Sequence, residues 1–137
     1  MSVFHSLQEA RDFFSKDLFA TSNNMTLDAL TEDGAVCGME ITERHMNAAN
    51  RVMGAVYYTM ADFAFAVANN YDMEEAVTVT LSSQISFLSA AKSNRLFAEA
   101  RVLKEGYGTT FYTVEVMDEL GTQIAVVSSS GYRMHRT

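Results

Sequence analysis

The chain has 137 residues, enough for one domain with a substantial core but too short for two. Its 17 acidic and 10 basic residues give a formal net charge of -7, and it has no basic run, so nucleic acid is excluded as the expected partner. A single cysteine excludes an internal disulfide, and the absence of proline, of a low-complexity linker and of a leader pattern predicts one cytoplasmic domain over residues 1–137.

The first predicted element is an amphipathic helix over about residues 6–19. Ser6 and Glu9 have the spacing of a capping box, in which a hydroxyl and a carboxylate bind free amides at a helix start. The apolar residues that recur at helical spacing are Val3, Leu7, Ala10, Phe14 and Leu18. We expect this helix to pack against the domain without a chemical role.

Alternating apolar residues predict β-strands on both sides of the central stretch. A hairpin is expected over about residues 25–29 and 35–41, with Asp33-Gly34 as its turn. Four more alternating runs follow at about residues 76–89, 95–105, 109–118 and 122–133. Since no long helical pattern separates these four runs, they should pair in antiparallel fashion. The expected fold class is α+β, with a curved antiparallel sheet around one buried helix.

The central stretch, residues 45–71, is a polar loop that runs into a long apolar helix. Between Arg51 and Asp72 its only charged side chain is Asp62. A helix that is apolar on every face is expected to be buried, and burying an isolated charge is costly. Asp62 should therefore be paired, protonated or used in chemistry, and a structural carboxylate is the alternative. A membrane span is disfavoured by the central Asp62 and by the lack of a basic flank.

The residues before Asp62 form a recognisable motif. His45 and Asn47 are followed by Gly54 and then by Met60-Ala61-Asp62. This arrangement resembles the signature of hotdog-fold acyl-CoA thioesterases of the phenylacetyl-CoA thioesterase (PaaI-like) family, which reads H-x-N-x-x-G-x-x-H-G-G and then D. The resemblance implies the hotdog fold and covers the chain from about residue 40 onward.

Three positions depart from the family signature. Asn50 stands where the family has Gly, and Asn tolerates a left-handed backbone better than most residues. Met53 replaces the His, and a thioether cannot donate a hydrogen bond or carry a proton. Ala55 replaces the second Gly. These departures leave open a non-catalytic acyl-CoA-binding or regulatory protein as the alternative to a thioesterase.

The chemistry of thioester hydrolysis sets a geometric condition on this helix. Hydrolysis needs a base or nucleophile and donors for the oxyanion, and the free amides at a helix start are such donors. Gly54 and Ala55 lie at the expected helix start, whereas Asp62 lies eight residues later, about 12 Å along the axis. One helix therefore cannot bring both groups to one thioester carbon. Two antiparallel helices related by a two-fold axis can do so.

The resemblance implies such a shared site. Asn47 and the Gly54 amide would come from one subunit and Asp62, as base or nucleophile, from its partner, in a homodimer that pairs further into a dimer of dimers. Asn47 would orient the thioester or the water. The expected substrate is an acyl-CoA or a related thioester, and no cofactor or metal is expected. Further residues expected to contact the substrate are Met53, Ala55, Tyr58 and Thr80, although Thr80 also fits the polar face of an ordinary strand.

The remaining candidate residues have simpler explanations. His5 and His135 lie near the termini, where a solvated imidazole is expected, and His45 should shape the loop rather than move protons. Cys37 alternates with apolar neighbours, as a buried small side chain does. Dehydratase or hydratase chemistry on the same fold is disfavoured because no histidine occurs between His45 and His135.

Overall fold

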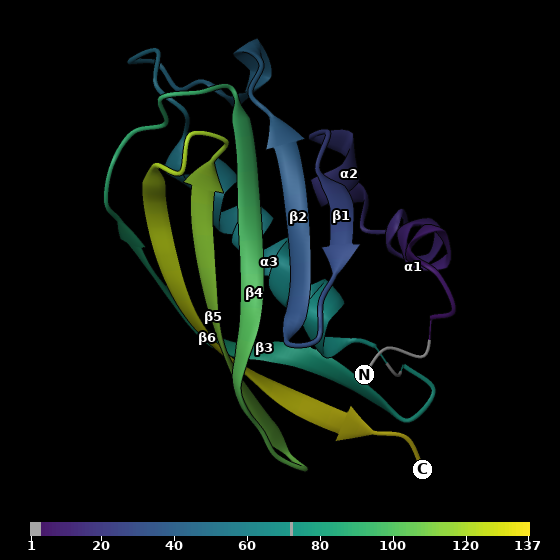
Figure 1. Ribbon diagram of the computed structural model, residues 1–137. Coiled ribbons are helices and arrows are strands. Elements are labelled where there is room, and N and C mark those ends of the chain that lie inside the picture. The colour runs from purple at the N-terminus through teal and green to yellow at the C-terminus, as the bar shows by residue number, and fades with distance from the viewer. Residues whose placement is uncertain (1–3, 72) are drawn as a thin grey trace.

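The computed structural model describes residues 4–71 and 73–137. It contains one curved, six-stranded antiparallel sheet with a long helix across its concave face (Figure 1). The strands are β1 (Thr26–Leu30), β2 (Gly34–Glu40), β3 (Ala76–Phe87), β4 (Arg95–Glu105), β5 (Thr109–Asp118) and β6 (Gln123–His135). The helices are α1 (Leu7–Phe14), α2 (Leu18–Ser22), the 3-10 turn η1 (Glu43–His45) and α3 (Gly54–Asn69). The predicted α+β class and antiparallel pairing are confirmed.

The N-terminal segment forms two helices, so the prediction of one continuous helix over residues 6–19 is wrong. Ser6 caps α1 as expected, because its hydroxyl accepts a hydrogen bond from the Glu9 amide at 3.1 Å. After α1 the chain turns, with the Asp17 amide donating to the Phe14 carbonyl at 3.0 Å, and Asp17 becomes the N-cap of α2. Asp17 belongs to the residue types preferred at helix N-caps, although its side chain makes no capping bond here.

The first hairpin forms where it was expected, but its glycine has a different role. The connection between β1 and β2 is Thr31–Asp33, and Gly34 is the first residue of β2 rather than part of the turn. A Cβ at position 34 would collide with the carbonyl oxygen of Ala100 on β4. Gly34 is therefore required by close strand packing, and Cys37 on the same strand is buried as predicted.

The core lies between α3 and the sheet. The inner side of α3 packs on β2, β4 and β5 and buries its larger apolar side chains, among them Met60, Phe63, Phe65 and Val67. None of the helices in the described part of the chain is long and apolar enough to cross a membrane.

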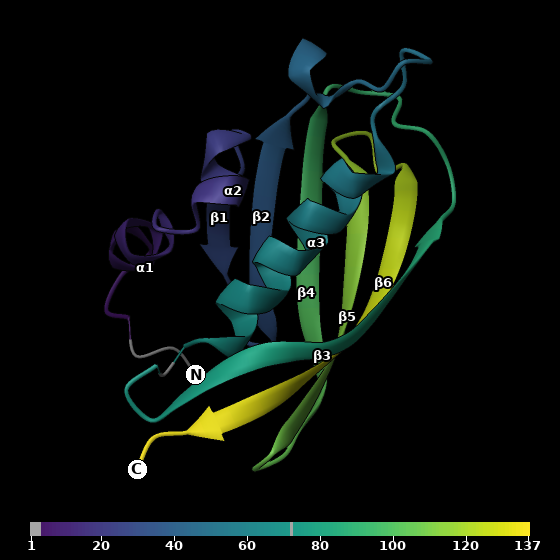
Figure 2. The ribbon, with the colours of Figure 1, turned by 180° about the vertical axis from the view of Figure 1, so that it is seen from behind.

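The outer side of α3 is uncovered in the single chain (Figure 2), so the expectation that this helix is buried all round is wrong there. Ala55 and Asp62 are exposed, and Thr59 and Ala66 are half-buried, at helical spacing along one stripe. The sequence pattern is misleading because the two alanines of this stripe count as apolar whether or not anything covers them. Asp62 thus lies on an open surface.

Buried polar groups fix the C-terminal end of α3. The Thr110 hydroxyl donates to Asn69 Oδ1 at 2.7 Å, and the Thr78 amide donates to Asn70 Oδ1 at 2.9 Å. These bonds tie α3 to β5 and to β3, and buried polar groups with partners of this kind favour one arrangement of the elements. The position of Asp62 relative to the sheet is set in part by these contacts.

Strand β3 lies at one edge of the sheet, whose order is β1-β2-β4-β5-β6-β3. It is 12 residues long and, among the described strands, it pairs only with β6. It also exposes Val79 and Leu81, with 41% and 59% of their surfaces accessible. A long, uncovered edge strand is a ready partner for another strand.

Candidate active site

The loop before α3 is held by its own side chains. Asn47 Oδ1 accepts hydrogen bonds from the backbone amides of Ala49 at 2.9 Å and Arg51 at 3.1 Å. Asn50 has a left-handed backbone with φ of 58°, which explains how Asn occupies a position where the family signature has Gly. The carbonyl oxygen of Asn47 thus shapes the loop, and its Nδ2 amide has no acceptor in the described part of the chain.

His45 also shapes this loop. Its side chain is 1% exposed, and its Nδ1 accepts a hydrogen bond from the Thr42 amide at 2.9 Å. That bond assigns the proton to Nε2, which donates to the Asn23 carbonyl oxygen at 3.1 Å. Both ring nitrogens are therefore engaged, and they fasten the loop to the residue that follows α2.

The N-terminus of α3 presents free backbone donors. Gly54 is its first residue, and the N-cap Met53 makes no side-chain capping bond. In the described part of the chain the amides of Gly54 and Ala55 have no acceptor. A Cβ at position 54 would come within 3.0 Å of the Phe87 ring, so a larger residue would press on β3 as well as cover the amide. This end of α3 is suited to bind an anionic oxygen.

A pocket of about 500 Å³ opens beside Gly54. Its walls come from the loop before α3, from the start of α3 and from the segment after β3, and two of its lining residues, Arg51 and Lys92, are cationic. The lining residues are Ile41, Met46, Asn50, Arg51, Val52, Gly54, Tyr57, Phe87, Ala90, Ala91, Lys92, Ser93 and Asn94. In a chain with a net charge of -7, this pair of cations gives the pocket a local attraction for anions.

Asp118 holds the segment after β3 that forms one wall of this pocket. Its side chain is 2% exposed, and its two oxygens accept backbone hydrogen bonds from Lys92 at 2.8 Å, Thr122 at 2.9 Å and Leu120 at 3.0 Å. Burial alone would raise the pKa of Asp118, but these hydrogen bonds outweigh it and hold the pKa below its ordinary value of 3.8. Asp118 is a structural carboxylate that positions the pocket wall.

Asp62 lies on the exposed stripe of α3, in a second pocket. That pocket has a volume of about 260 Å³, and α2 forms its other wall. Although Asp62 is exposed, the protein around its carboxylate removes part of its hydration and raises its pKa above the ordinary value of 3.8. A raised pKa favours a role as proton acceptor near neutral pH.

The structure separates the two groups that were predicted to act on one thioester. Gly54 and Asp62 lie in one helix, about 12 Å apart along its axis, and they line different pockets of the described chain. The other residues expected at the site, namely Asn47, Met53, Ala55, Tyr58 and Thr80, line neither of these two pockets. The residues predicted for the site are therefore not brought together within the described part of one chain.

Several lining residues were missed by the sequence reasoning. They include Tyr57, Phe87, Arg51 and Lys92, none of which was among the residues expected at the site. Only folding brings the loop before α3 beside the segment after β3. For Asp17 a signal was present, because an Asp after Ser-Lys is a good helix N-cap and could have marked the start of α2.

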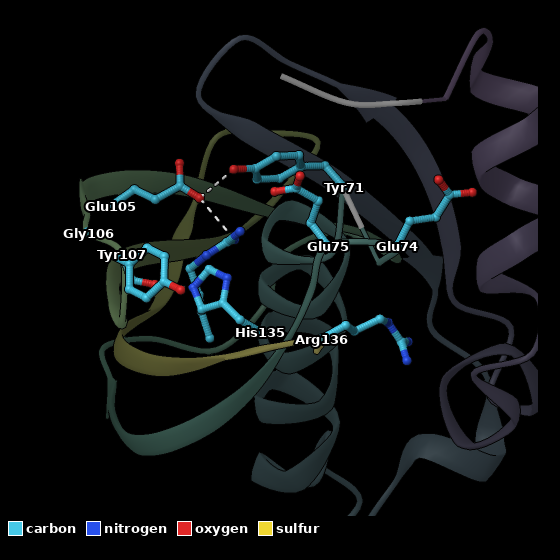
Figure 3. A pocket seen from close by; sticks show the side chains of 9 residues that line it. Tyr71, Glu74, Glu75, Glu105, Gly106, Tyr107, His135 and Arg136 are labelled. Atoms are coloured by element: carbon cyan, nitrogen blue, oxygen red, sulfur yellow. Dashed lines mark hydrogen bonds and ion pairs between the residues drawn. The ribbon is translucent and has the colours of Figure 1, made fainter.

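A larger pocket of about 560 Å³ lies beyond the other end of α3 (Figure 3). Glu105 accepts hydrogen bonds there from the Tyr71 hydroxyl at 2.8 Å and from Arg133 at 3.4 Å, and the Tyr107 ring stacks on His135 at 3.8 Å. The imidazole of His135 is thus packed and hydrogen-bonded, not simply solvated as expected from its place near the terminus. None of the residues predicted for catalysis lines this pocket.

Comparison with known proteins assigns the chain to a family. The model of the thioesterase superfamily matches residues 49–125, which are more than half of the chain and include both Gly54 and Asp62. The chain belongs to the thioesterase superfamily. This membership assigns thioester hydrolysis to the chain, as the signature around Asp62 predicted.

Members of the thioesterase superfamily resemble the chain over nearly its whole length. A protein of Archaeoglobus fulgidus with a general esterase name is 30% identical over 132 residues, covering 94% of this chain and 84% of that protein. Acyl-coenzyme A thioesterase PaaI of Escherichia coli is 25% identical over 131 residues, covering 95% and 92%. A structure of a variant of phenylacetic acid degradation protein PaaI from Thermus thermophilus matches with a TM-score of 0.78 and 27% identity, covering 86% of this chain and 100% of that one. The hotdog fold and the PaaI-like resemblance are thereby confirmed.

Proposed function

We propose that this thioesterase works as a dimer in which each site combines the Gly54 end of one α3 with the partner's Asp62. Two observations support this arrangement. The free amides at Gly54 and the carboxylate of Asp62 lie about 12 Å apart along one helix, too far to act on one carbon. Asp62 also lies on the exposed stripe of α3, and Gly54 lines an open pocket at the start of the same helix. An antiparallel pair of α3 helices would bring the two parts together.

The edge strand β3 supports the same dimer. Its 12 residues leave one row of backbone donors and acceptors without a partner strand in the described chain. If β3 pairs with the β3 of a second copy, the two sheets become continuous and the two α3 helices lie side by side on the same face. Val79 and Leu81, which are exposed in the single chain, lie on this edge strand.

The chemistry follows from the two parts. With Asp62 as general base, a water molecule transfers a proton to the carboxylate as its oxygen attacks the thioester carbon. The carbonyl oxygen becomes an oxyanion that accepts hydrogen bonds from the amides of Gly54 and Ala55. When the tetrahedral intermediate collapses, the carbon–sulfur bond breaks, and the leaving thiolate takes up the proton that Asp62 received. Asp62 attacking the carbon directly would need the same ionised carboxylate and the same oxyanion donors.

We infer that the substrate is an acyl-CoA. The pocket beside Gly54 carries Arg51 and Lys92, which suit the phosphate groups of coenzyme A, and its volume of about 500 Å³ lies within the usual range of ligand sites of about 300–1,000 Å³. The name of the Escherichia coli relative, acyl-coenzyme A thioesterase, supports the same substrate class. A cytoplasmic location fits this substrate and stays a prediction.

The observation that carries this proposal is that α3 begins without a side-chain cap at a cationic pocket and carries, eight residues later, an exposed carboxylate of raised pKa. A thiol-release assay over short, long and aryl acyl-CoAs tests it, combined with sedimentation at micromolar concentration. We expect release of free thiol from at least one thioester and a sedimenting species of at least dimer mass. A monomer that hydrolyses acyl-CoA at full rate would contradict the shared site, and binding without hydrolysis would restore the non-catalytic alternative.

A further inference from the structure

The pocket around Asp62 contains a second carboxylate and two exposed apolar side chains, all from the start of α2. Asp17 is the N-cap of α2, yet its side chain makes no capping bond. Leu18 and Phe19 each expose 73% of their surface. The residues that line the pocket are Asp17, Leu18, Phe19, Ala20, Thr59, Asp62, Phe63 and Ala66. Four consecutive residues, from the N-cap Asp17 to Ala20, thus line the same pocket as the proposed base.

We infer that Asp17, Leu18 and Phe19 select the acyl group of the substrate. Leu18 and Phe19 hold a neutral, apolar acyl group, and Asp17 excludes acyl groups that end in a carboxylate. The inference rests on the proposed function, because a thioester carbon that reacts with Asp62 brings its acyl group into this pocket.

The apolar wall is held in place by the residues that follow it. Ala20 is 5% exposed and anchors α2 in the core, and the Thr21 hydroxyl donates to the Asp17 carbonyl oxygen at 3.1 Å. The bond from His45 to the Asn23 carbonyl fixes the end of α2. The pocket volume of about 260 Å³ is below the range of about 300–1,000 Å³ for sites of drug-sized ligands, so it suits an acyl group rather than a whole acyl-CoA.

The charges in the pocket disfavour an anionic acyl group. None of the described residues that line it is cationic, and Lys16, next to Asp17 in sequence, lies over the ring of Phe13 at 5.1 Å instead. The Thr59 hydroxyl donates to the helix backbone at 2.7 Å, so its proton is already engaged. Burial raises the pKa of Asp17, and the negative charge of Asp62 raises it further. A third carboxylate in this pocket would meet two like charges and find no cation.

The two pockets therefore have opposite electrostatic characters. Arg51 and Lys92 mark the pocket beside Gly54 as the place for the phosphate-bearing part of the substrate, whereas Asp17 and Asp62 mark the α2 pocket as a place for an uncharged part. This difference would fix the direction in which the thioester lies across the shared site.

The test compares hexanoyl-CoA with adipoyl-CoA, whose acyl chains have equal length and differ in the terminal carboxylate. In the parent protein, kcat/KM should favour hexanoyl-CoA by at least about tenfold. Asp17→Asn should raise kcat/KM for adipoyl-CoA relative to that for hexanoyl-CoA by about tenfold. Phe19→Ala should lower kcat/KM for hexanoyl-CoA relative to that for acetyl-CoA, whose acyl group is shorter, by about tenfold.

Leu120→Ala is the matched control, because Leu120 is similarly exposed, at 69%, in the turn between β5 and β6. The inference would be overturned, while the proposed function stands, by either of two results. One is an equal kcat/KM of the parent protein for both thioesters. The other is an equal effect of Phe19→Ala and Leu120→Ala on kcat/KM. Loss of dimer mass in Phe19→Ala without a change in preference would assign Phe19 to the subunit interface and also overturn it. If no thioester is hydrolysed, the proposed function fails and the inference falls with it.

Discussion

Replacing Asp62 by Asn tests the role of the carboxylate without changing the shape of the side chain. Asp62 is exposed and has no hydrogen-bond or ion-pair partner in the described part of the chain, so the substitution removes no structural contact. Losing a positioned acid–base group costs at least about a hundredfold in rate. We therefore expect kcat to fall by at least that factor, about 2.7 kcal/mol at about 1.36 kcal/mol per tenfold.

Asp62→Asn should not lower the stability of the fold, although it lowers kcat. The pKa of Asp62 is raised in the folded protein, so ionisation is less favourable there than in the unfolded chain, and above pH 3.8 the ionised carboxylate lowers stability. Asp62→Asn should therefore keep or raise Tm at pH 7. The assay is steady-state thiol release on the best substrate found, with Asp33→Asn, an exposed loop aspartate, as the control. Turnover at the parental rate would show that Asp62 is a surface carboxylate without a catalytic role.

Three further substitutions have defined outcomes. Gly54→Ala places a methyl group within 3.0 Å of the Phe87 ring and beside the oxyanion donors, so kcat should fall by about a hundredfold, and an unchanged kcat would place the oxyanion elsewhere. Met53→His should raise kcat relative to Met53→Leu, because an imidazole at the exposed N-cap adds a donor, and equal rates would show that position 53 only packs. The pKa of Asp118 is lower in the folded protein than in the unfolded chain, so the ionised carboxylate stabilises the fold above pH 3.8. This contribution is lost as pH falls through the folded pKa. Asp118→Asn should therefore lower the urea midpoint at pH 7 more than at pH 3.

The positions of the strands could be predicted from the sequence because they depend on local residue patterns. Alternating apolar residues between turn residues predicted β4 and β5 at their observed bounds, residues 95–105 and 109–118. The position of β3 at the sheet edge could not be predicted from the sequence. The order of the strands depends on how α3 carries the chain from β2, near one edge of the sheet, to β3 at the other edge. The break between α1 and α2 was missed because the apolar spacing continues through Leu18.

The chemistry of the site was readable only in part. The signature placed Gly54 at a helix start and singled out Asp62, because both depend on residue type and spacing along one helix. Sequence reasoning took Asp62 to be buried, since it could not show that small residues line an open stripe on α3. Asp17 lies 45 positions before Asp62 and meets it only through the packing of α2 on α3, so no local pattern could connect them.

Subunit complementation tests the shared site most directly. Asp62→Asn and Gly54→Val are each expected to be inactive, and in a mixed dimer the intact Gly54 of the first variant meets the intact Asp62 of the second. Unfolding and refolding the two together in equal amounts should make about half of the dimers mixed, with one intact site each, and restore about a quarter of the parental activity. If each site lay within one chain, every site would keep one defect. The mixture would then stay as inactive as the separate variants, which would contradict the shared site.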